Sequence, residues 1–180
     1  FAMNNITPSH ISLALHPKQG IALQTEATEV LYGGSAGGGK SFLMRVAAVM
    51  WCGMIPGLQV YLFRRLRDDL VKNHIEGPQG LRTMLAPWVR DGFVSMVEDE
   101  IRFWNGAKIY LCHCKDEKDR FKYLGAEIHV LLLDELTTFT EKIYRFLRSR
   151  VRMAGVEVPE QFAGRFPRIL ASSNPGNVGH

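Results

Sequence analysis

Apolar residues are concentrated in short runs that are separated by longer segments of helical character. The runs that predict buried strands are Glu29–Tyr32, Gln59–Arg64, His129–Leu133 and Arg168–Ser172. A continuous apolar run such as His129–Leu133 is typical of a strand that is covered on both faces. The segment Ser41–Cys52 is apolar nearly all round, which predicts a helix packed against a sheet. Strands separated by helices predict an α/β fold with a mostly parallel central sheet flanked by helices.

Alternation of apolar and polar residues predicts an inserted β-hairpin. Phe93–Trp104 and Ala107–Cys114 alternate on either side of Asn105-Gly106. An Asn-Gly dipeptide between two such runs is the strongest short-range hairpin signal, because its turn requires positive φ angles that these residues tolerate. The charged segment Lys115–Lys122 that follows predicts a loop.

Helix boundaries are predicted from capping residues, glycine and proline. Thr138-x-x-Glu141 matches a capping box for a helix near the end of the chain. Apolar residues fall on one face of that helix: Phe139, Ile143, Phe146 and Leu147. Earlier in the chain, Gly77-Pro78 and Pro87 predict that the helical segment after Gln59–Arg64 is broken into short pieces.

Composition favours one folded domain over residues 1–180, with 46% hydrophobic and 22% charged residues. Residues 1–3 are interpreted as a cloning remnant or an irregular start. Three cysteines, an odd number, argue against a disulfide framework and for a reducing compartment. No apolar run approaches the roughly 18 residues that a membrane span needs, and nothing resembles a signal peptide. A formal net charge of +4 permits an anionic partner such as nucleic acid.

A glycine-rich segment carries the first functional pattern, G-x4-G-K-[ST]. It consists of Gly34, Ser35, Ala36, Gly37, Gly38, Gly39, Lys40 and Ser41. The segment follows a predicted strand and begins a predicted helix, which is the context that a phosphate-binding loop requires. Glycines let backbone N–H groups face a polyphosphate, and the helix start adds partial positive charge. Lys40 is expected to reach the β- and γ-phosphates and Ser41 to bind Mg²⁺; a glycine-rich surface loop is the alternative.

Two adjacent acids, Asp134 and Glu135, follow the buried run His129–Leu133. Carboxylates at the end of a buried strand are costly unless they face a cation or a water. Asp134 is expected to hold Mg²⁺ together with Ser41, and Glu135 to deprotonate an attacking water as a general base. The alternative is a solvated acidic turn.

Two amide side chains are further candidates for nucleotide binding. Asn174 follows the last predicted strand in Ser172-Ser173-Asn174-Pro175, so it is expected near the γ-phosphate, where it can sense that group. An ordinary Asn-Pro turn is the alternative. Gln19, upstream of the glycine loop, can use both the donor and the acceptor of its amide against the adenine edge. Most glutamines, however, are simply solvated.

The order of these motifs resembles the ATPase domain of large terminase subunits, the genome-packaging motors of tailed bacteriophages. The motifs are Gln19, GGSAGGGKS, LFRR, the hairpin, HVLLLDE and LASSNPGN, and they cover almost the whole chain. The resemblance implies a P-loop NTPase of the additional-strand, catalytic-glutamate type that hydrolyses ATP with Mg²⁺. It further implies a Walker A loop at Gly34–Ser41, Walker B residues Asp134 and Glu135, an adenine-contacting Gln19, and a coupling motif at Ser172-Ser173-Asn174.

The resemblance also implies how such a domain acts. ATP hydrolysis drives double-stranded DNA into a procapsid, with contacts to the DNA backbone because a packaging motor must accept any sequence. The implied partners are a homo-oligomeric ring, a pentamer, on the portal and a small terminase subunit, without a membrane. The implied location is the host cell cytoplasm, with transient docking on the procapsid and no place in the mature virion. Full-length relatives carry a nuclease domain with clustered acids; this chain has no further carboxylate cluster, so no DNA cleavage is expected.

Two features depart from the family pattern: the Walker A loop contains no arginine, and Ser-Ser replaces Thr-Thr before Asn174. The arginine that stabilises the transition state must therefore come from elsewhere. Arg64 and Arg65 end a predicted strand and are candidates within the same chain. Arg120, in the charged loop, is a candidate for a neighbouring subunit.

Further arginines lie along the helix predicted from Thr138. If that helix persists far enough, Arg150 falls in its apolar stripe beside Phe146, where a buried arginine needs a partner. The polar face of the helix carries Arg145, Arg148 and Arg152 with Glu141, and it is a candidate for contacts with DNA or a neighbouring subunit. For each arginine the alternative is a solvated surface charge.

Two other functions remain open. A helicase or recombinase core uses the same ATPase chemistry, but a helicase unwinds a labelled duplex, whereas a packaging ATPase translocates without strand separation. A nucleotide-binding switch with little hydrolysis is the second alternative. A guanine-specific switch contains Asn-Lys-x-Asp, which this sequence lacks, and a steady-state ATPase assay separates a switch from a motor.

Overall fold

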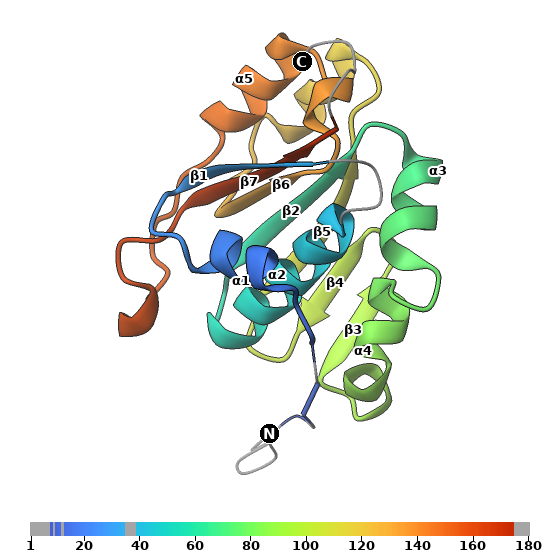
Figure 1. The fold of residues 1–180 in the computed structure, drawn as a ribbon, viewed down its shortest axis with the longest axis vertical. Helices are drawn as coiled ribbons and strands as arrows, with labels where there is room; N and C mark the ends of the chain where they lie inside the picture. Colours follow the sequence, from blue (N-terminus) through green and yellow to red (C-terminus); the bar gives the residue numbers. More distant parts are fainter. Residues whose placement is uncertain (1–7, 9, 12, 35–38, 175–180) are drawn as a thin grey trace.

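A computed structural model describes residues 8, 10, 11, 13–34 and 39–174. Seven strands form one sheet in the order β1-β7-β6-β2-β5-β4-β3 (Figure 1). Their bounds are β1 (Glu29–Gly33), β2 (Gln59–Arg64), β3 (Val94–Val97), β4 (Glu100–Phe103), β5 (Lys108–His113), β6 (Val130–Leu133) and β7 (Arg168–Ser173). All neighbours from β1 to β5 are parallel, and β4 and β3 continue the sheet as antiparallel strands. The mostly parallel sheet confirms the predicted α/β fold.

Helices cover both faces of this sheet. The α-helices are α1 (Pro17–Gln24), α2 (Lys40–Met54), α3 (Arg67–Leu70), α4 (Leu81–Arg90) and α5 (Glu141–Ser149). A π-helix, η1 (Val71–Ile75), follows α3, and the 3-10 helices are η2 (Glu117–Tyr123), η3 (Leu136–Thr138) and η4 (Glu160–Phe162). Helices α1, α2 and α4 pack on one face, and α5 packs with η2 on the other (Figure 1). None of the helices in the described ranges combines the length and apolar character needed to span a membrane.

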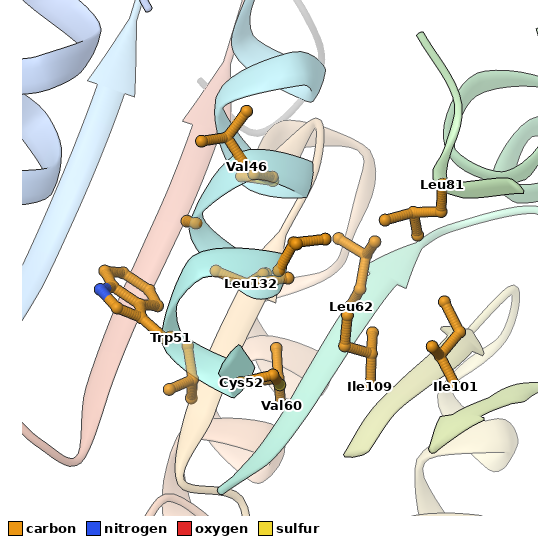
Figure 2. Close-up of a cluster of buried hydrophobic side chains, with 14 of the residues drawn as sticks. Val46, Trp51, Cys52, Val60, Leu62, Leu81, Ile101, Ile109 and Leu132 are labelled. Carbon is orange, nitrogen blue, oxygen red and sulfur yellow. The ribbon is translucent and has the colours of Figure 1, made fainter. Parts of the chain in front are cut away.

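The alternation of side chains along the strands divides the core into two clusters. Leu62 of β2 and Leu132 of β6 face α2, where they pack in one cluster with Trp51 (Figure 2). Phe63 and Leu133, the next residues of the same strands, belong to the cluster on the α5 side. All five side chains are buried. The continuous apolar run in β6 is therefore explained by burial on both faces of the sheet.

The predicted hairpin is present, but it belongs to a longer antiparallel meander. Gly106 has a φ of 83° in the turn between β4 and β5. The side chain of Asn105 donates to the carbonyl of Cys52 at 2.8 Å, which ties this turn to α2. Phe93–Trp104 is not the single hairpin arm that was expected, because the chain turns again at Glu98, with a φ of 52°, between β3 and β4.

Two predicted helix boundaries are wrong. The N-cap of α5 is Thr140, whose hydroxyl accepts from the N–H of Ile143 at 3.3 Å, and not Thr138, which lies in η3. Pro87 lies inside α4 and does not break it. The helix is amphipathic and is anchored in the core by Leu81 and Leu85, and this packing outweighs the hydrogen bond that proline cannot make.

The charged segment Lys115–Lys122 is also more ordered than the predicted loop. It forms most of η2, which begins after the cap residue Asp116. Oδ2 of Asp119 accepts from the N–H groups of Lys115 and Asp116 at 3.0 and 3.1 Å. A carboxylate that satisfies free N–H groups at a helix start stabilises the turn despite its high charge.

Leu132→Ala is expected to destabilise the fold by about 2–5 kcal/mol, because it leaves a cavity in the centre of the sheet. Urea unfolding measures this cost. Leu31→Ala is the matched control, since Leu31 is 62% exposed on the edge strand β1, and its cost is expected to stay within about 0.5 kcal/mol. Equal costs would contradict the placement of β6 inside the sheet and β1 at its edge.

Candidate functional site

The predicted functional segments meet at the carboxyl edge of the parallel strands. Strand β7 lies between β1 and β6, so Gly33 pairs with Ser173 and Leu133 pairs with Ala171. A cavity of about 370 Å³ opens at this edge. Predicted residues that line it are Gly39, Lys40, Ser41, Arg64, Asp134, Glu135 and Asn174. The fold thus brings together residues from four separate parts of the sequence.

The two described ends of the glycine loop lie close to each other. Gly39 precedes α2 with a φ of 70°, in the left-handed region that glycine favours. Lys40 is 7% exposed, and its Nζ donates to the carbonyl of Gly34 at 3.0 Å. This contact across the loop is compatible with a phosphate cradle. Four further predicted phosphate-binding residues lie outside the described residues: Ser35, Ala36, Gly37 and Gly38.

Ser41 and Asp134 are in direct contact although they are far apart in the sequence. Oγ of Ser41 donates to Oδ2 of Asp134 at 2.7 Å. Hydroxyl and carboxylate oxygens are hard ligands of the kind that Mg²⁺ prefers, and in P-loop proteins phosphate oxygens and water complete its shell. The donor set therefore fits a magnesium ion.

Asp134 is buried, and both of its carboxylate oxygens accept hydrogen bonds. Oδ2 is 2.6 Å from Nη1 of Arg64 and 2.7 Å from Nε2 of His74, while Oδ1 accepts from Oγ of Ser172 at 2.8 Å. Burial alone raises the pKa of Asp134, but the hydrogen bond from His74 and the charge of Arg64 outweigh it. The resulting pKa is well below its ordinary value, so the carboxylate is ionised, as a metal ligand must be.

Glu135 has a left-handed backbone conformation, with φ 55° and ψ 60°, that residues other than glycine rarely adopt. Its N–H donates to Oγ of Ser172 at 3.1 Å, and its Oε1 is 3.2 Å from Nη2 of Arg64. The Ser172 hydroxyl therefore accepts from Glu135 and donates to Asp134. Such backbone outliers cluster at functional sites, where the surrounding structure holds them in place.

Asn174 lines the same cavity. Its Oδ1 is buried and has no hydrogen-bond partner within the described part of the chain. Buried polar atoms are nearly always hydrogen-bonded, so an unpartnered one at a cavity is expected to meet a ligand or a water. An amide oxygen only accepts, so the partner of Oδ1 must be a donor such as water. A contact of Asn174 with the γ-phosphate would use its side-chain N–H, and it stays a prediction.

Arg64 is the predicted arginine that lies at the site. It ends β2, its side chain is 11% exposed, and its guanidinium bridges Asp134 and Glu135. Arg65, the next residue, is exposed and does not line the cavity. A bridging cation also explains how two adjacent acids are held side by side at the end of a buried strand.

Arg120 lies in η2, on the α5 side of the sheet, and does not line the cavity. Its guanidinium donates to the carbonyl of Glu117 and lies 4.3 Å from the ring centroid of Phe121. Within one chain it contacts neither Asp134 nor Glu135. A contact with a neighbouring subunit, as predicted from the sequence, stays a prediction.

Arg150 lies near the amino ends of the parallel strands, whereas the cavity lies at their carboxyl ends. Helix α5 ends at Ser149 and does not persist through Arg150, which is its C-cap; the Arg150 guanidinium nevertheless lies 5.9 Å from the ring centroid of Phe146, the neighbour that was predicted. Its carbonyl accepts from the N–H of Ile128, which precedes β6, whereas Asp134 follows β6. The guanidinium finds a partner in the carbonyl of Leu124 at 2.8 Å. The fold therefore does not bring Arg150 to the site within this chain.

The predicted basic face of α5 is largely paired. Arg145 is 2.6 Å from Glu141 in an i,i+4 ion pair, and Arg148 donates two hydrogen bonds to Glu29 of β1. Arg152 lies beyond the end of the helix. Hydrogen bonds from Arg148 and Tyr144 lower the pKa of Glu29. Less unpaired positive charge on α5 is therefore available for DNA than the sequence of this helix predicts.

Gln19 makes hydrogen bonds within the chain, and its predicted adenine contact stays a prediction. Its side chain is buried, its Oε1 accepts from the N–H of His16 at 2.8 Å, and its Nε2 donates to the carbonyl of Gly39 at 2.9 Å. Both ends of the amide are therefore engaged with the backbone. Gln19 ties the start of α1 to the end of the glycine loop.

Further residues around the cavity are not evident from the sequence. Arg45 is buried on α2, donates to the carbonyl of Asn73 at 2.5 Å, and lies 3.3 Å from Nδ1 of His74. Asn73 and Gln79 also line the cavity. A signal for Arg45 exists, because a cation inside the apolar segment Ser41–Cys52 needs a polar partner. The short segment around His74 has no comparable pattern.

Comparison with known proteins identifies the family of this chain. Residues 31–155, which contain the glycine-rich pattern Gly34–Ser41 and both acids, match the family described as terminase large subunit, T4likevirus-type, N-terminal. The chain belongs to this family of large terminase subunits. A search of curated proteins finds no match.

Solved structures of one large terminase, from a thermophilic bacteriophage, share this family fold. One crystal form of that protein has a TM-score of 0.63 and 17% identity, covering 88% of this chain and 39% of that one. Its complex with ATP-gamma-S has a TM-score of 0.61 and 17% identity, covering 88% and 38%. Its complex with ADP has a TM-score of 0.61 and 18% identity, covering 89% and 38%. The chain thus spans 38–39% of the length of these terminases.

Gly39→Ala is expected to lower the stability of the fold by about 1–3 kcal/mol, mainly because alanine is strained at its positive φ. A Cβ there would also lie 2.5 Å from Nε2 of Gln19. Thermal unfolding measures the loss. Gly33→Ala is the matched control, since a Cβ at Gly33 meets no atom within 4 Å. If both variants were equally stable, the tight junction between the loop and α1 would be contradicted.

Proposed function

We propose that this chain binds ATP and Mg²⁺ at the carboxyl edge of the sheet and hydrolyses ATP. As part of a large terminase subunit, it uses hydrolysis to translocate double-stranded DNA into a procapsid. The observation that carries the ATPase proposal is the 2.7 Å contact between Ser41 and Asp134, which joins the glycine loop to the acidic pair. Membership of the terminase family supports the motor proposal.

The residues of the cavity have distinct roles in this proposal. Lys40 and the backbone N–H groups at the start of α2 bind the phosphates. Ser41 and Asp134 hold Mg²⁺, which when bound neutralises charge on the β- and γ-phosphates. Asn174 contacts the γ-phosphate through its side-chain N–H, and its unpartnered Oδ1 accepts from a water.

Glu135 is the proposed general base. Its side chain is 30% exposed and lines the cavity, so it is accessible to water. Its backbone is held by Ser172, which fixes the position from which the carboxylate accepts a proton. The bridge by Arg64 keeps the side chain beside Asp134.

Arg64 is the proposed arginine that stabilises transition-state charge from within the chain. It lines the same cavity as Lys40 and contacts Glu135 directly. We propose that Arg120 contacts a neighbouring subunit in a homo-oligomeric ring. It lies away from the cavity, beside Phe121, and the Phe121 side chain is 51% exposed. We propose the pentameric ring on the portal and the small terminase subunit as partners, and the host cell cytoplasm as the location.

DNA is proposed to be contacted through its phosphates, because a packaging motor must accept any sequence. The formal net charge of +4 is compatible with such a polyanion. With Arg145 and Arg148 paired to acids, α5 offers little unpaired positive charge to DNA.

Glu135→Gln is expected to keep ATP affinity and lower turnover by about 10²–10⁴-fold, because glutamine cannot accept the proton of the attacking water. Steady-state ATP hydrolysis and fluorescent-nucleotide titration measure the two quantities. Glu141→Gln, at an exposed acid on α5, is the control and should keep wild-type turnover. Retained turnover in Glu135→Gln would remove the glutamate from the mechanism.

Arg64→Gln is expected to lower turnover by about 10³-fold, the order of magnitude known for arginines that stabilise a transferring phosphoryl group. Steady-state kinetics measures kcat and KM, and thermal unfolding shows whether the variant is folded. Arg152→Gln, at an exposed arginine beyond α5, serves as the control. A folded Arg64→Gln chain with normal kcat would show that another arginine has this role.

A further inference from the structure

His74 lies in the π-helix η1, the turn Val71–Ile75 that follows α3, and its side chain is fully buried. Single π-helical turns are rare and occur frequently at functional sites. None of the sequence motifs described above includes this turn. The buried histidine therefore needs an explanation of its own.

The imidazole contacts two side chains, one with each ring nitrogen. Nε2 is 2.7 Å from Oδ2 of Asp134, and Nδ1 is 3.3 Å from Nη1 of Arg45. A guanidinium can only donate, so Nδ1 accepts and the ring proton lies on Nε2. His74 is thus a neutral donor to Asp134, with its tautomer set by Arg45.

Arg45 is itself fixed by the same π turn. Its Nη1 donates to the carbonyl of Asn73 at 2.5 Å. It lies on α2, one helical turn after Ser41. A continuous line of contacts therefore runs from the helix that follows the glycine loop, through Arg45 and His74, to Asp134.

The donors to Oδ2 of Asp134 approach from different sides. Ser41 and Arg64 line the cavity, whereas His74 does not. The hydrogen bond from His74 therefore comes from the protein interior. Carboxylates that bind metal are commonly oriented by such outer partners, whose loss weakens metal binding.

We propose that His74 is a positioning residue for the magnesium site. Its Nε2–H holds Asp134 in the orientation in which the carboxylate binds Mg²⁺ together with Ser41. This inference rests on the proposed function, because it assigns a role beside a proposed metal ligand. It extends the nucleotide site to η1 and to Arg45.

The test compares two amide substitutions at one position. In His74→Gln the side-chain N–H can reach the place of Nε2, whereas in His74→Asn it reaches only the place of Nδ1. Mant-ADP is titrated into the full chain in excess EDTA and in Mg²⁺, and the ratio of the two Kd values gives the factor by which Mg²⁺ tightens binding. His74→Gln is expected to keep this factor, and His74→Asn to lower it by about 10–100-fold. The affinity in EDTA should be the same for all three proteins.

The inference would be overturned if Mg²⁺ tightened mant-ADP binding by the same factor in both variants, whether that factor were retained or lost. Should His74→Asn fail to fold, ¹⁵N NMR of wild-type His74 gives a decision without a variant: a neutral Nε2–H tautomer is expected, and a proton on Nδ1 overturns the proposal. Failure of the proposed function looks different, because the wild-type chain would then bind no mant-ADP, or bind it without any effect of Mg²⁺.

Discussion

Asp134 carries its negative charge at 1% exposure, and a buried charge is costly unless polar groups replace the water that it loses. Four side chains do so here, and each comes from a different element: Ser41 on α2, Arg64 on β2, His74 on η1 and Ser172 on β7. None of these donors is close to Asp134 in the sequence. The Asp134 carboxylate at the end of β6 therefore connects α2, β2, η1 and β7 to one another.

The parallel sheet makes this convergence possible. Strands β2, β6 and β7 run in the same direction as neighbours, so their carboxyl ends lie at one edge. The next neighbour, β1, leads to the glycine loop, and α2 returns across the sheet with its first residues at the same edge (Figure 1). The packing of Trp51 and Leu132 between α2 and β6 therefore helps to position Ser41 beside Asp134. Contacts that stabilise the core thus also set the geometry of the site.

Polar side chains connect the helices to this edge. Arg64 bridges Asp134 and Glu135, Gln19 joins α1 to the end of the glycine loop, and Arg45 joins α2 to η1. These side chains are largely buried and hydrogen-bonded, and in a low dielectric such bonds have well-defined geometry. The cavity is consequently surrounded by residues whose orientations are set before any ligand binds, which is the arrangement that phosphoryl transfer requires.

The sequence by itself determined the strands β1, β2, β6 and β7, the position of the glycine-rich pattern between β1 and α2, and the acids at the end of β6, because periodicity and motif spacing are properties of neighbouring residues. It also placed Asn174 at the sheet edge, since parallel strands share their carboxyl end. It did not determine the partners of Gln19, Arg64 and His74, whose contacts span 20, 70 and 60 positions. It also missed the turn at Glu98, and it left open where α5 ends, which is at Ser149. Only the tertiary structure decided these hydrogen-bond partners, because the donor that reaches a buried acceptor depends on the packing of the whole chain.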